Sequence, residues 1–432
     1  MKSLREIRDG VSGLVFRFGV CLVVLGLCIP VFADNWPQYN GPNHNRISAE
    51  RLGLKERLGA SPSQVWKVKT NTGFSSFVTG ESKTFTLVRR TVNEVEREVC
   101  VALDIETGKE IWARPLARAK YDGGGESGTA DNRGGDGPRS TPGYDSGKVY
   151  VLDAQLALHC FDAVSGEVIW AKDILKEHQG RLITWQSTAS PLIEGDLVFV
   201  MGGGSGQSLL AFDKASGKVA WKAEDEKMTH ATPVAATIHG LRQVIFLTQS
   251  GLVSVVPKTG KVLWRQPYPY EVSTAASPVV FEDIVYCSAG YGVGAGAYRI
   301  KKTAEGFKSE QIWRQPGKLM NHWSTPVCKD GYLYGMFSFK NYGKGPMSCV
   351  DIRTGKTEWS QNGFGPGNCI IVDGCVVALS DKGEVVIVEA RPRGYRELYR
   401  ADILDGKCWP SPSFSNGHLY VRSTKEGACL DF

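Results

Sequence analysis

The sequence lacks most of the short patterns that would point directly to a chemistry. Its 432 residues carry 51 Lys+Arg against 45 Asp+Glu, and a formal charge of only +6 excludes the strong basic field that nucleic-acid binding needs. The 11 cysteines form no CxxC motif and no adjacent pair, and the absence of CxxCH excludes a covalently attached haem. No GxxxxGK(S/T) motif marks a phosphate-binding loop. What is present is a globular composition, 42% hydrophobic, whose 50 glycines favour tight turns and β structure.

An uncharged, strongly apolar run from Gly19 to Ala33 follows a basic N-terminus. The run is too short to span a bilayer comfortably, and Val31 and Ala33 stand at the small-residue positions that signal peptidase reads. We therefore expect a signal peptide over residues 1–33, cleaved after Ala33, and a periplasmic or secreted protein with no transmembrane segment after cleavage. Lipid attachment at Cys28 is disfavoured because the preceding residue, Leu27, is not small.

A hairpin pattern, Asp-x-x-(Thr/Ser)-Gly-x-x-x-Trp, recurs along the chain. Clear copies run over Asp104–Trp112, Asp162–Trp170, Asp213–Trp221 and Asp351–Trp359, a fifth ends at Trp264 with Val256 in the Asp position, and weaker copies end at Trp313 and Leu398. The pattern predicts a strand that ends at Asp, a turn in which glycine takes a positive φ, and a second strand that carries Trp inward. A large side chain at one fixed place per unit predicts an anchor between neighbouring units.

A second pattern precedes each hairpin: a small residue and usually a proline, then a strand, a polar turn and another strand. Its eight copies begin at Ser75, Ser140, Ala189, Ala231, Ala276, Ser324, Gly367 and Pro410. The last copy lacks its hairpin tryptophan, and an orphan strand near the N-terminus, SPSQVWKVK, supplies Trp66 to complete it.

Four short strands per unit, with a split last unit, predict an all-β fold. We expect a single eight-bladed β-propeller of four-stranded antiparallel blades, the last blade being closed by an N-terminal strand. Residues 34–60 would form an N-terminal extension and residues 61–432 the propeller. The predicted structural blade anchors are Trp66, Trp112, Trp170, Trp221, Trp264, Trp313 and Trp359.

Three cysteines fall at one position of the repeat. Cys160, Cys349 and Cys429 occupy it, where other units have Ala102, Ala211 and Ser254. A position that alternates among Cys, Ala and Ser predicts a small buried slot, so we expect packing cysteines there and no disulfides between repeats.

The hairpin repeats resemble the pyrroloquinoline-quinone (PQQ) repeat, AxDxxTGKxxW, of quinoprotein alcohol dehydrogenases and of the propeller lipoprotein of outer-membrane barrel assembly. The segment NWPQYNGPNHNRIS is also similar to the WPxFxGPxxxG opening of exported PQQ-like propellers of bacteria. The resemblance implies the propeller fold over nearly the whole chain after the signal peptide, and it makes PQQ with calcium the cofactor to consider. The enzymes' adjacent cysteine pair and calcium-binding motifs have no match here, so no catalytic residue is transferred.

In a propeller, the connection between blades ends beside the central channel, just before each small-Pro start. Three tryptophans outside the anchor set fall at these places, together with basic residues. The candidate ligand-binding residues are Arg139, Trp185, His230, His322, Trp323, Lys407 and Trp409. Such an aromatic and cationic channel mouth suits a planar, anionic or sugar-like ligand, whereas the plain alternative is that these side chains only plug the channel. No third ligand with metal-site spacing accompanies the histidines, so we predict no metal site.

One connection, from Ala113 to Arg139, is about twice as long as the others or more and is rich in glycine. Long loops in compact domains usually have a function, so we expect a flap over the mouth. Its candidate ligand contacts are Tyr121, Asp122, Glu126 and Asp131.

Three functions follow, in order of preference. The first is an exported, monomeric binding propeller that takes a small ligand or an envelope protein partner at the mouth. The second is a PQQ-dependent quinoprotein dehydrogenase that oxidises an alcohol or sugar. The third is a scaffold in cell-envelope or outer-membrane assembly.

Overall fold

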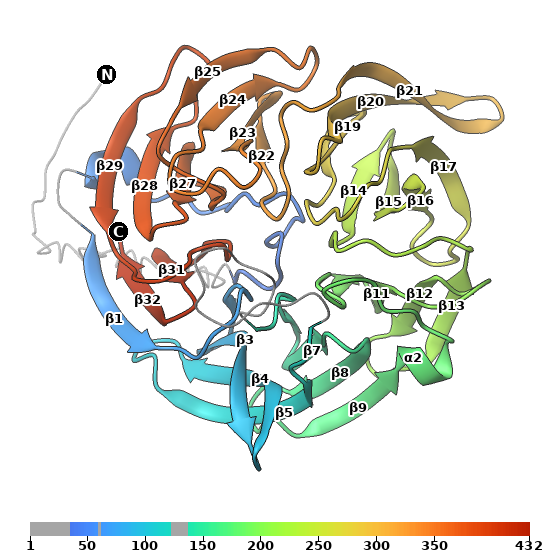
Figure 1. The fold of residues 1–432 in the computed structure, drawn as a ribbon, viewed down its shortest axis with the longest axis horizontal. Coiled ribbons are helices and arrows are strands. Elements are labelled where there is room, and N and C mark those ends of the chain that lie inside the picture. Colours follow the sequence, from blue (N-terminus) through green and yellow to red (C-terminus); the bar gives the residue numbers. More distant parts are fainter. Residues whose placement is uncertain (1–34, 59–61, 122–136) are drawn as a thin grey trace, which may run out of the picture. The chain divides into compact units, whose positions relative to one another are not determined.

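The computed structural model describes residues 35–58, 62–121 and 137–432. These residues form eight four-stranded antiparallel sheets arranged in a ring, which confirms the predicted eight-bladed β-propeller (Figure 1). Two one-turn helices, α1 (Leu54–Arg57) and α2 (Ile174–Glu177), are the only helices in the described ranges, and neither is long enough to cross a membrane.

The blades follow one another in chain order. Blade 1 contains β2 (Val78–Gly80), β3 (Lys83–Val92), β4 (Val95–Asp104) and β5 (Glu110–Arg118); blade 2 contains β6 (Gly143–Asp145), β7 (Lys148–Leu152), β8 (Ala157–Asp162) and β9 (Val168–Asp173). Blade 3 contains β10 (Leu192–Glu194), β11 (Leu197–Met201), β12 (Leu209–Asp213) and β13 (Val219–Ala223); blade 4 contains β14 (Val234–Ile238), β15 (Leu241–Thr248), β16 (Gly251–Val255) and β17 (Val262–Pro267). Blade 5 contains β18 (Val279–Phe281), β19 (Ile284–Ala289), β20 (Gly294–Thr303) and β21 (Gly306–Gln315); blade 6 contains β22 (Val327–Lys329), β23 (Tyr332–Met336), β24 (Met347–Asp351) and β25 (Thr357–Gln361). Blade 7 contains β26 (Asn368–Val372), β27 (Cys375–Leu379), β28 (Glu384–Glu389) and β29 (Glu397–Asp402); blade 8 contains β30 (Ser413–Ser415), β31 (His418–Arg422), β32 (Glu426–Asp431) and β1 (Ser63–Lys69).

Blade 8 is built from both ends of the described chain. Strand β1 pairs antiparallel with β32, and Trp66 lies opposite Cys429 in the register. The ring is therefore closed by main-chain hydrogen bonds, which leaves no open sheet edge at the point where the repeats end.

The hairpin tryptophans lie at the seams between blades. Five of them donate Nε1–H to the backbone carbonyl that directly follows the Asp position of the next blade, as in Trp66 to Ile105 at 2.9 Å and Trp112 to Ala163 at 3.1 Å. The other three of this group are Trp170, Trp221 and Trp313, which donate to Lys214, Pro257 and Ile352. Trp359 donates in the same way to Arg391, so each of these six indoles ties its blade to the following one.

The glycine of the hairpin turn is part of the same seam. Gly166 has φ +71°, and a Cβ at this position would lie 2.7 Å from Trp112 Cδ2 of the preceding blade. The sequence therefore needs glycine here for two reasons, the left-handed backbone and the close approach of the indole.

Trp264 is the exception among the anchors. Its Nε1 donates to Gln243 Oε1 of its own blade at 2.8 Å. The next blade, blade 5, has ten-residue strands β20 and β21 in place of the short Asp-Thr-Gly hairpin, so the usual acceptor is missing from the seam.

Blade 7 corrects one detail of the sequence alignment. Leu398 was expected at the anchor position, but the register places Tyr399 opposite Ile387, as Trp170 lies opposite Cys160. The hairpin turn of blade 7 is longer than the repeat: Tyr399 comes ten residues after Glu389, which takes the Asp position, whereas Trp170 comes eight residues after Asp162. All nine cysteines in the described ranges are buried and outside disulfides.

The segment from residue 35 to 48 crosses the channel and contacts the innermost strands of several blades (Figure 1). Thr79 N of blade 1 donates to Trp36 O at 2.9 Å, and Tyr144 N of blade 2 donates to Pro37 O at 2.7 Å. On the other side of the ring, Ile371 N of blade 7 donates to Arg46 O at 3.0 Å. Main chain of this segment therefore runs across the channel.

Candidate functional site

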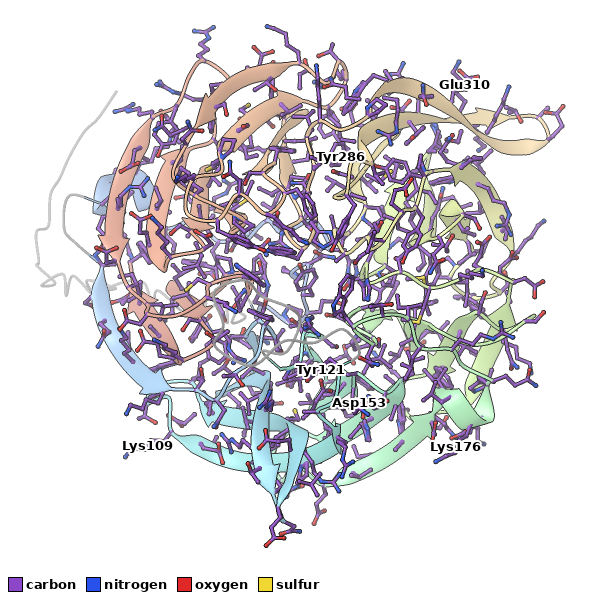
Figure 2. All side chains as sticks on the ribbon, in the orientation of Figure 1. Lys109, Tyr121, Asp153, Lys176, Tyr286 and Glu310 are labelled. Carbon is purple, nitrogen blue, oxygen red and sulfur yellow. The ribbon has the colours of Figure 1, made fainter. Side chains whose placement is uncertain are left out.

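A cavity of about 380 Å³ occupies the mouth of the channel. Six of the seven predicted ligand-binding residues line it: Arg139, Trp185, His230, His322, Trp323 and Trp409. Lys407 lies beside the cavity, with Nζ 5.7 Å from the Trp409 ring centroid. The connections between blades therefore converge on one space, as the repeat alignment predicted. Figure 2 shows Lys109, Lys176 and Glu310 at the outer rim of the ring, with Tyr121 much closer to its centre.

One wall of the cavity is a stack of aromatic rings. The Trp323 and Trp409 centroids are 4.5 Å apart with an interplanar angle of 27°, and Phe74 stacks on Trp409 at 4.6 Å and 17°. Trp323 Nε1 donates to Pro366 O at 3.0 Å, which fixes its orientation. Because the indoles already cover one another, this wall is rigid and preformed.

Part of the cavity wall is formed by residues with a strained backbone. Trp185, Tyr291 and Lys340 all line the cavity, and their φ angles are +68°, +54° and +53°. Bulky residues rarely adopt this left-handed region, which costs of order 1–3 kcal/mol and persists at functional sites more often than elsewhere.

Both histidines are neutral at neutral pH. His230 is buried, with Nε2 3.0 Å from Thr184 O and Nδ1 2.8 Å from Ser273 Oγ, and burial lowers its pKa to about 4. His322 lies among aromatic rings, 4.8 Å from Trp323 and 5.0 Å from Phe339. Burial, with His230 and Lys340 nearby, lowers the pKa of His322 to about 3, and its buried Nδ1 has no hydrogen-bond partner among the described residues.

The charged residues in the cavity wall are cations. Arg139 lies over the Tyr121 ring at 4.9 Å, and Lys340 Nζ lies 4.7 Å from the Tyr291 centroid. The described lining residues include no Asp or Glu. The cavity therefore suits a ligand with a flat apolar part and an anionic group.

A buried carboxyl group supports the wall near Arg139. Glu98 is 1% exposed and accepts hydrogen bonds from Tyr121 Oη at 2.7 Å and Ala154 N at 2.9 Å. Burial and the nearby Asp153 raise the pKa of Glu98 to about 7. Tyr121 thus acts as a support for Arg139 in this structure, and the other expected flap contacts, Asp122, Glu126 and Asp131, lie outside the described residues.

Several lining residues were not predicted from the sequence. Tyr291 and Lys340 come from the turns between the second and third strands of blades 5 and 6, which also reach the mouth, and Tyr39 comes from the segment that crosses the channel. The one sequence signal for them is the aromatic and basic turn FSFKNYGKG, residues 337–345, which is longer than the corresponding turns of most other blades.

The residues present match only part of what PQQ with calcium would need. The aromatic wall, Arg139, Lys340 and the unpartnered His322 Nδ1 fit a planar anion. Calcium prefers carboxylate and amide oxygens, and no cluster of three His, Cys, Asp or Glu side chains occurs within the described part of the chain.

Fold, repeats and channel mouth together define a propeller of the PQQ-repeat class. The PQQ_2 family model, described as "Outer membrane protein assembly factor BamB", matches residues 95–361, and the chain belongs to this family.

Two curated relatives carry that same name. The one from Moranella endobia (strain PCIT) is 22% identical over 354 residues, covering 79% of this chain and 73% of the relative. The one from Yersinia pestis is 22% identical over 297 residues, covering 65% of this chain and 70% of the relative.

Solved structures of two kinds share the fold. BamB from Moraxella catarrhalis matches with a TM-score of 0.59 and 15% identity, over 86% of this chain and 100% of that one. Quinohemoprotein alcohol dehydrogenase from Comamonas testosteroni matches with a TM-score of 0.65 and 13% identity, over 92% of this chain and 80% of that one. At these identities the likeness concerns the fold alone.

Proposed function

We propose that the protein is a non-catalytic binding scaffold of the cell envelope, which engages a partner protein or a small ligand at the channel mouth. Membership of the family described by an outer-membrane assembly factor supports the envelope role. One observation supports the binding role. The histidines that line the mouth, His230 and His322, have pKa values lowered to about 4 and about 3, and no described carboxylate lines the cavity. Such a wall offers recognition groups but no described general base for chemistry near neutral pH.

The partner is tested by capture from envelope extract of the native host. Wild-type protein is compared with Lys340→Ala and with the matched exposed control Lys176→Ala, which lies on the outer rim (Figure 2). We expect a membrane β-barrel or an assembly protein to be recovered by the wild type and the control, and less of it by Lys340→Ala. Recovery of no envelope protein contradicts the scaffold, and equal recovery by all three places the interface away from the mouth.

A small ligand at the mouth is tested by its dependence on the aromatic wall. Affinity for any ligand that co-purifies with the protein should fall in Trp323→Ala and Trp409→Ala. If both variants bind as the wild type does, the ligand occupies another place. Density or absorbance for a bound molecule in protein from the native host is the most direct measurement.

The enzyme remains the second candidate because the mouth fits a planar anion. Its test is reconstitution with PQQ and calcium, followed by dye reduction with alcohols and sugars. Turnover that is lost in His322→Ala would overturn the non-catalytic proposal. Quinone binding without turnover would instead make PQQ a ligand of the scaffold.

Export is part of the same proposal. We expect a signal peptide over residues 1–33, an extension over residues 34–60 and the propeller over residues 61–432. The mature protein should then begin at Asp34. We also expect it to be a monomer. Mass spectrometry of protein from the native host should find this N-terminus, and a lipid-modified Cys28 would contradict it. Light scattering tests the monomer.

A further inference from the structure

A second cavity, of about 240 Å³, has a lining separate from that of the mouth and includes exposed residues such as Asn43 and Thr237. Tyr39 lines the mouth cavity, whereas the next residue, Asn40, lines the second one. The other walls are the turn 43–46, strand β14 of blade 4, and the residues around β18 of blade 5 and β22 of blade 6. Two further charged side chains, Arg242 and Glu282, also line the cavity. This cavity is not part of the site proposed above.

The innermost strands present the same backbone donor to the channel in every blade. Two residues after the proline that opens the strand, Tyr144 N donates to Pro37 O and Ile193 N donates to Gln38 Oε1, at 2.7 and 3.1 Å. Antiparallel pairing alternates the direction of the N–H groups, so this register position faces away from the second strand of the blade. Ala235, Val280 and Cys328 stand at this position in blades 4, 5 and 6, and all three line the second cavity.

The crossing segment does not serve these three donors. It contacts blades 1, 2 and 3 with consecutive residues, then turns, with Arg46 N donating to Asn40 O at 2.8 Å, and reaches blade 7 through Arg46. No hydrogen bond joins the described part of this segment to Ala235, Val280 or Cys328 N. The turn therefore leaves backbone N–H groups of three neighbouring blades directed into one cavity, an arrangement that binds anions.

Two buried side chains add to this arrangement. Arg46 is 1% exposed and donates only to neutral oxygens, including Asn368 Oδ1 at 2.9 Å and Cys369 O at 3.0 Å, and it forms no ion pair with a described residue. His44 Nε2 lies 3.0 Å from Glu194 Oε2, while its buried Nδ1 has no partner among the described residues. Because a carboxylate can only accept, Nε2 carries a proton, and the buried Nδ1 is left to hydrogen-bond a polar group of a ligand.

We propose that this cavity, the inner site, binds a small carboxylic acid with a hydroxyl or ammonium group on the α carbon. The carboxylate accepts from the backbone N–H groups of Ala235, Val280 and Cys328 and is attracted by the charge of Arg46. The α substituent hydrogen-bonds His44 Nδ1. A buried cation without an ionic partner is costly, so an anion in reach of Arg46 stabilises the folded ring as well as the complex.

The inner site is tested by calorimetric titration of the full mature chain with lactate and with alanine. The neutral analogues 1,2-propanediol and lactamide serve as ligand controls because they keep the α donor and lack the carboxylate. We expect binding of lactate or alanine and none of the analogues. No heat from either acid at millimolar concentration overturns the proposal, and equal binding of the neutral analogues overturns the anion site.

The backbone donor is tested by Val280→Pro, with Val280→Ala as the matched control. Proline removes one N–H that faces the channel and leaves the hydrogen bonds to β19 intact, so the blade should fold. Loss of a hydrogen bond to a charged group predicts affinity about tenfold or more lower in Val280→Pro than in Val280→Ala. Equal affinity in the two variants contradicts the assignment.

His44 gives a second test that does not alter the backbone. His44→Phe should weaken binding. His418→Phe, at a half-buried histidine of blade 8, should leave it unchanged. The location is tested by Trp409→Ala at the mouth. Affinity that survives Trp409→Ala supports the inner site, and affinity lost there would place the acid at the mouth and overturn the proposal.

Discussion

The seams between blades and the channel mouth are both built around tryptophan, but in different ways. At six seams, an indole that occupies a fixed place in a repeated hairpin donates to a carbonyl of the next blade, as Trp112 does to Ala163. At the mouth, Trp323 and Trp409 come from connections of different sequence, and they stack on one another. The repeated tryptophans hold the ring together, whereas the unrepeated ones shape a space. Within a repeat protein, departure from the repeat is therefore the better guide to a binding site.

The largest effect should come from removing a seam anchor. Trp112→Ala leaves a cavity between blades 1 and 2 and an unused carbonyl at Ala163, and we expect a loss of about 3–5 kcal/mol in the free energy of unfolding. Trp185→Ala, at the partly exposed mouth, should lose less than about 1.5 kcal/mol. Urea denaturation compares the two. If Trp185→Ala lost as much stability as Trp112→Ala, the distinction between seam and mouth tryptophans would be wrong.

The hairpin glycine should show the next largest effect. Gly166→Ala combines a left-handed backbone with a clash against Trp112, whereas Gly147→Ala has a similar φ of +76° and open space around the Cβ. We expect a loss of about 1 kcal/mol for Gly147→Ala from the backbone alone, and about 1–3 kcal/mol more for Gly166→Ala. Thermal melting measures both, and equal losses would mean that the seam yields to the added methyl group.

The mouth should make the protein sensitive to acid through its histidines. The pKa of His322 is about 3 in the folded state against an ordinary value of 6.5, so the unfolded chain binds the extra proton between these pH values. The stabilisation is present above pH 6.5 and is lost as the pH falls toward 3, by up to about 1.4 kcal/mol per pH unit. The stability difference between wild type and His322→Phe should follow this slope. A difference that stays constant from pH 8 to pH 4 would show that His322 is not buried as a neutral ring.

Glu98 should show a smaller dependence of the opposite sign. Its pKa is about 7 in the folded state against an ordinary value of 4.5, so the folded protein binds the extra proton between these values. Relative to Glu98→Gln, the wild type should gain stability as the pH falls from 7 to 4.5, by up to about 1 kcal/mol per pH unit. Denaturation at pH 7.5 and pH 5 measures this difference. A gain on raising the pH would mean that Glu98 is stabilised as a carboxylate.

The repeat pattern predicted the ring and most residues of the mouth because both follow from counting the repeated strand starts along the sequence. Eight strand starts and the orphan strand with Trp66 were enough to close blade 8, and the residues before each start led to Arg139, Trp185, His230, His322, Trp323 and Trp409. The count failed where a hairpin departs from the repeat in length or shape. Tyr399 takes the anchor position expected for Leu398, and Trp264 has no acceptor in the next blade.

The residues that the sequence did not reveal reach the channel along paths outside the repeat. Tyr291 and Lys340 lie in turns between second and third strands. Lys407, which was predicted, lies beside the cavity, with Nζ 5.7 Å from the Trp409 ring centroid. Nothing in the local pattern of residues 35–48 indicates that they cross the ring. Their contacts join positions far apart in the sequence, as in Gln38 with Ile193.

The sequence by itself determined the number of blades, the closure of the ring and the places where blade connections end, because these follow from the spacing of turns and anchors within one repeat. Only the tertiary structure decided which donors and rings face one another across the channel. That outcome depends on how eight innermost strands and a crossing segment share one central space. The segment accepts hydrogen bonds from the backbone N–H groups of some innermost strands, and it leaves those of Ala235, Val280 and Cys328 without a partner from the segment.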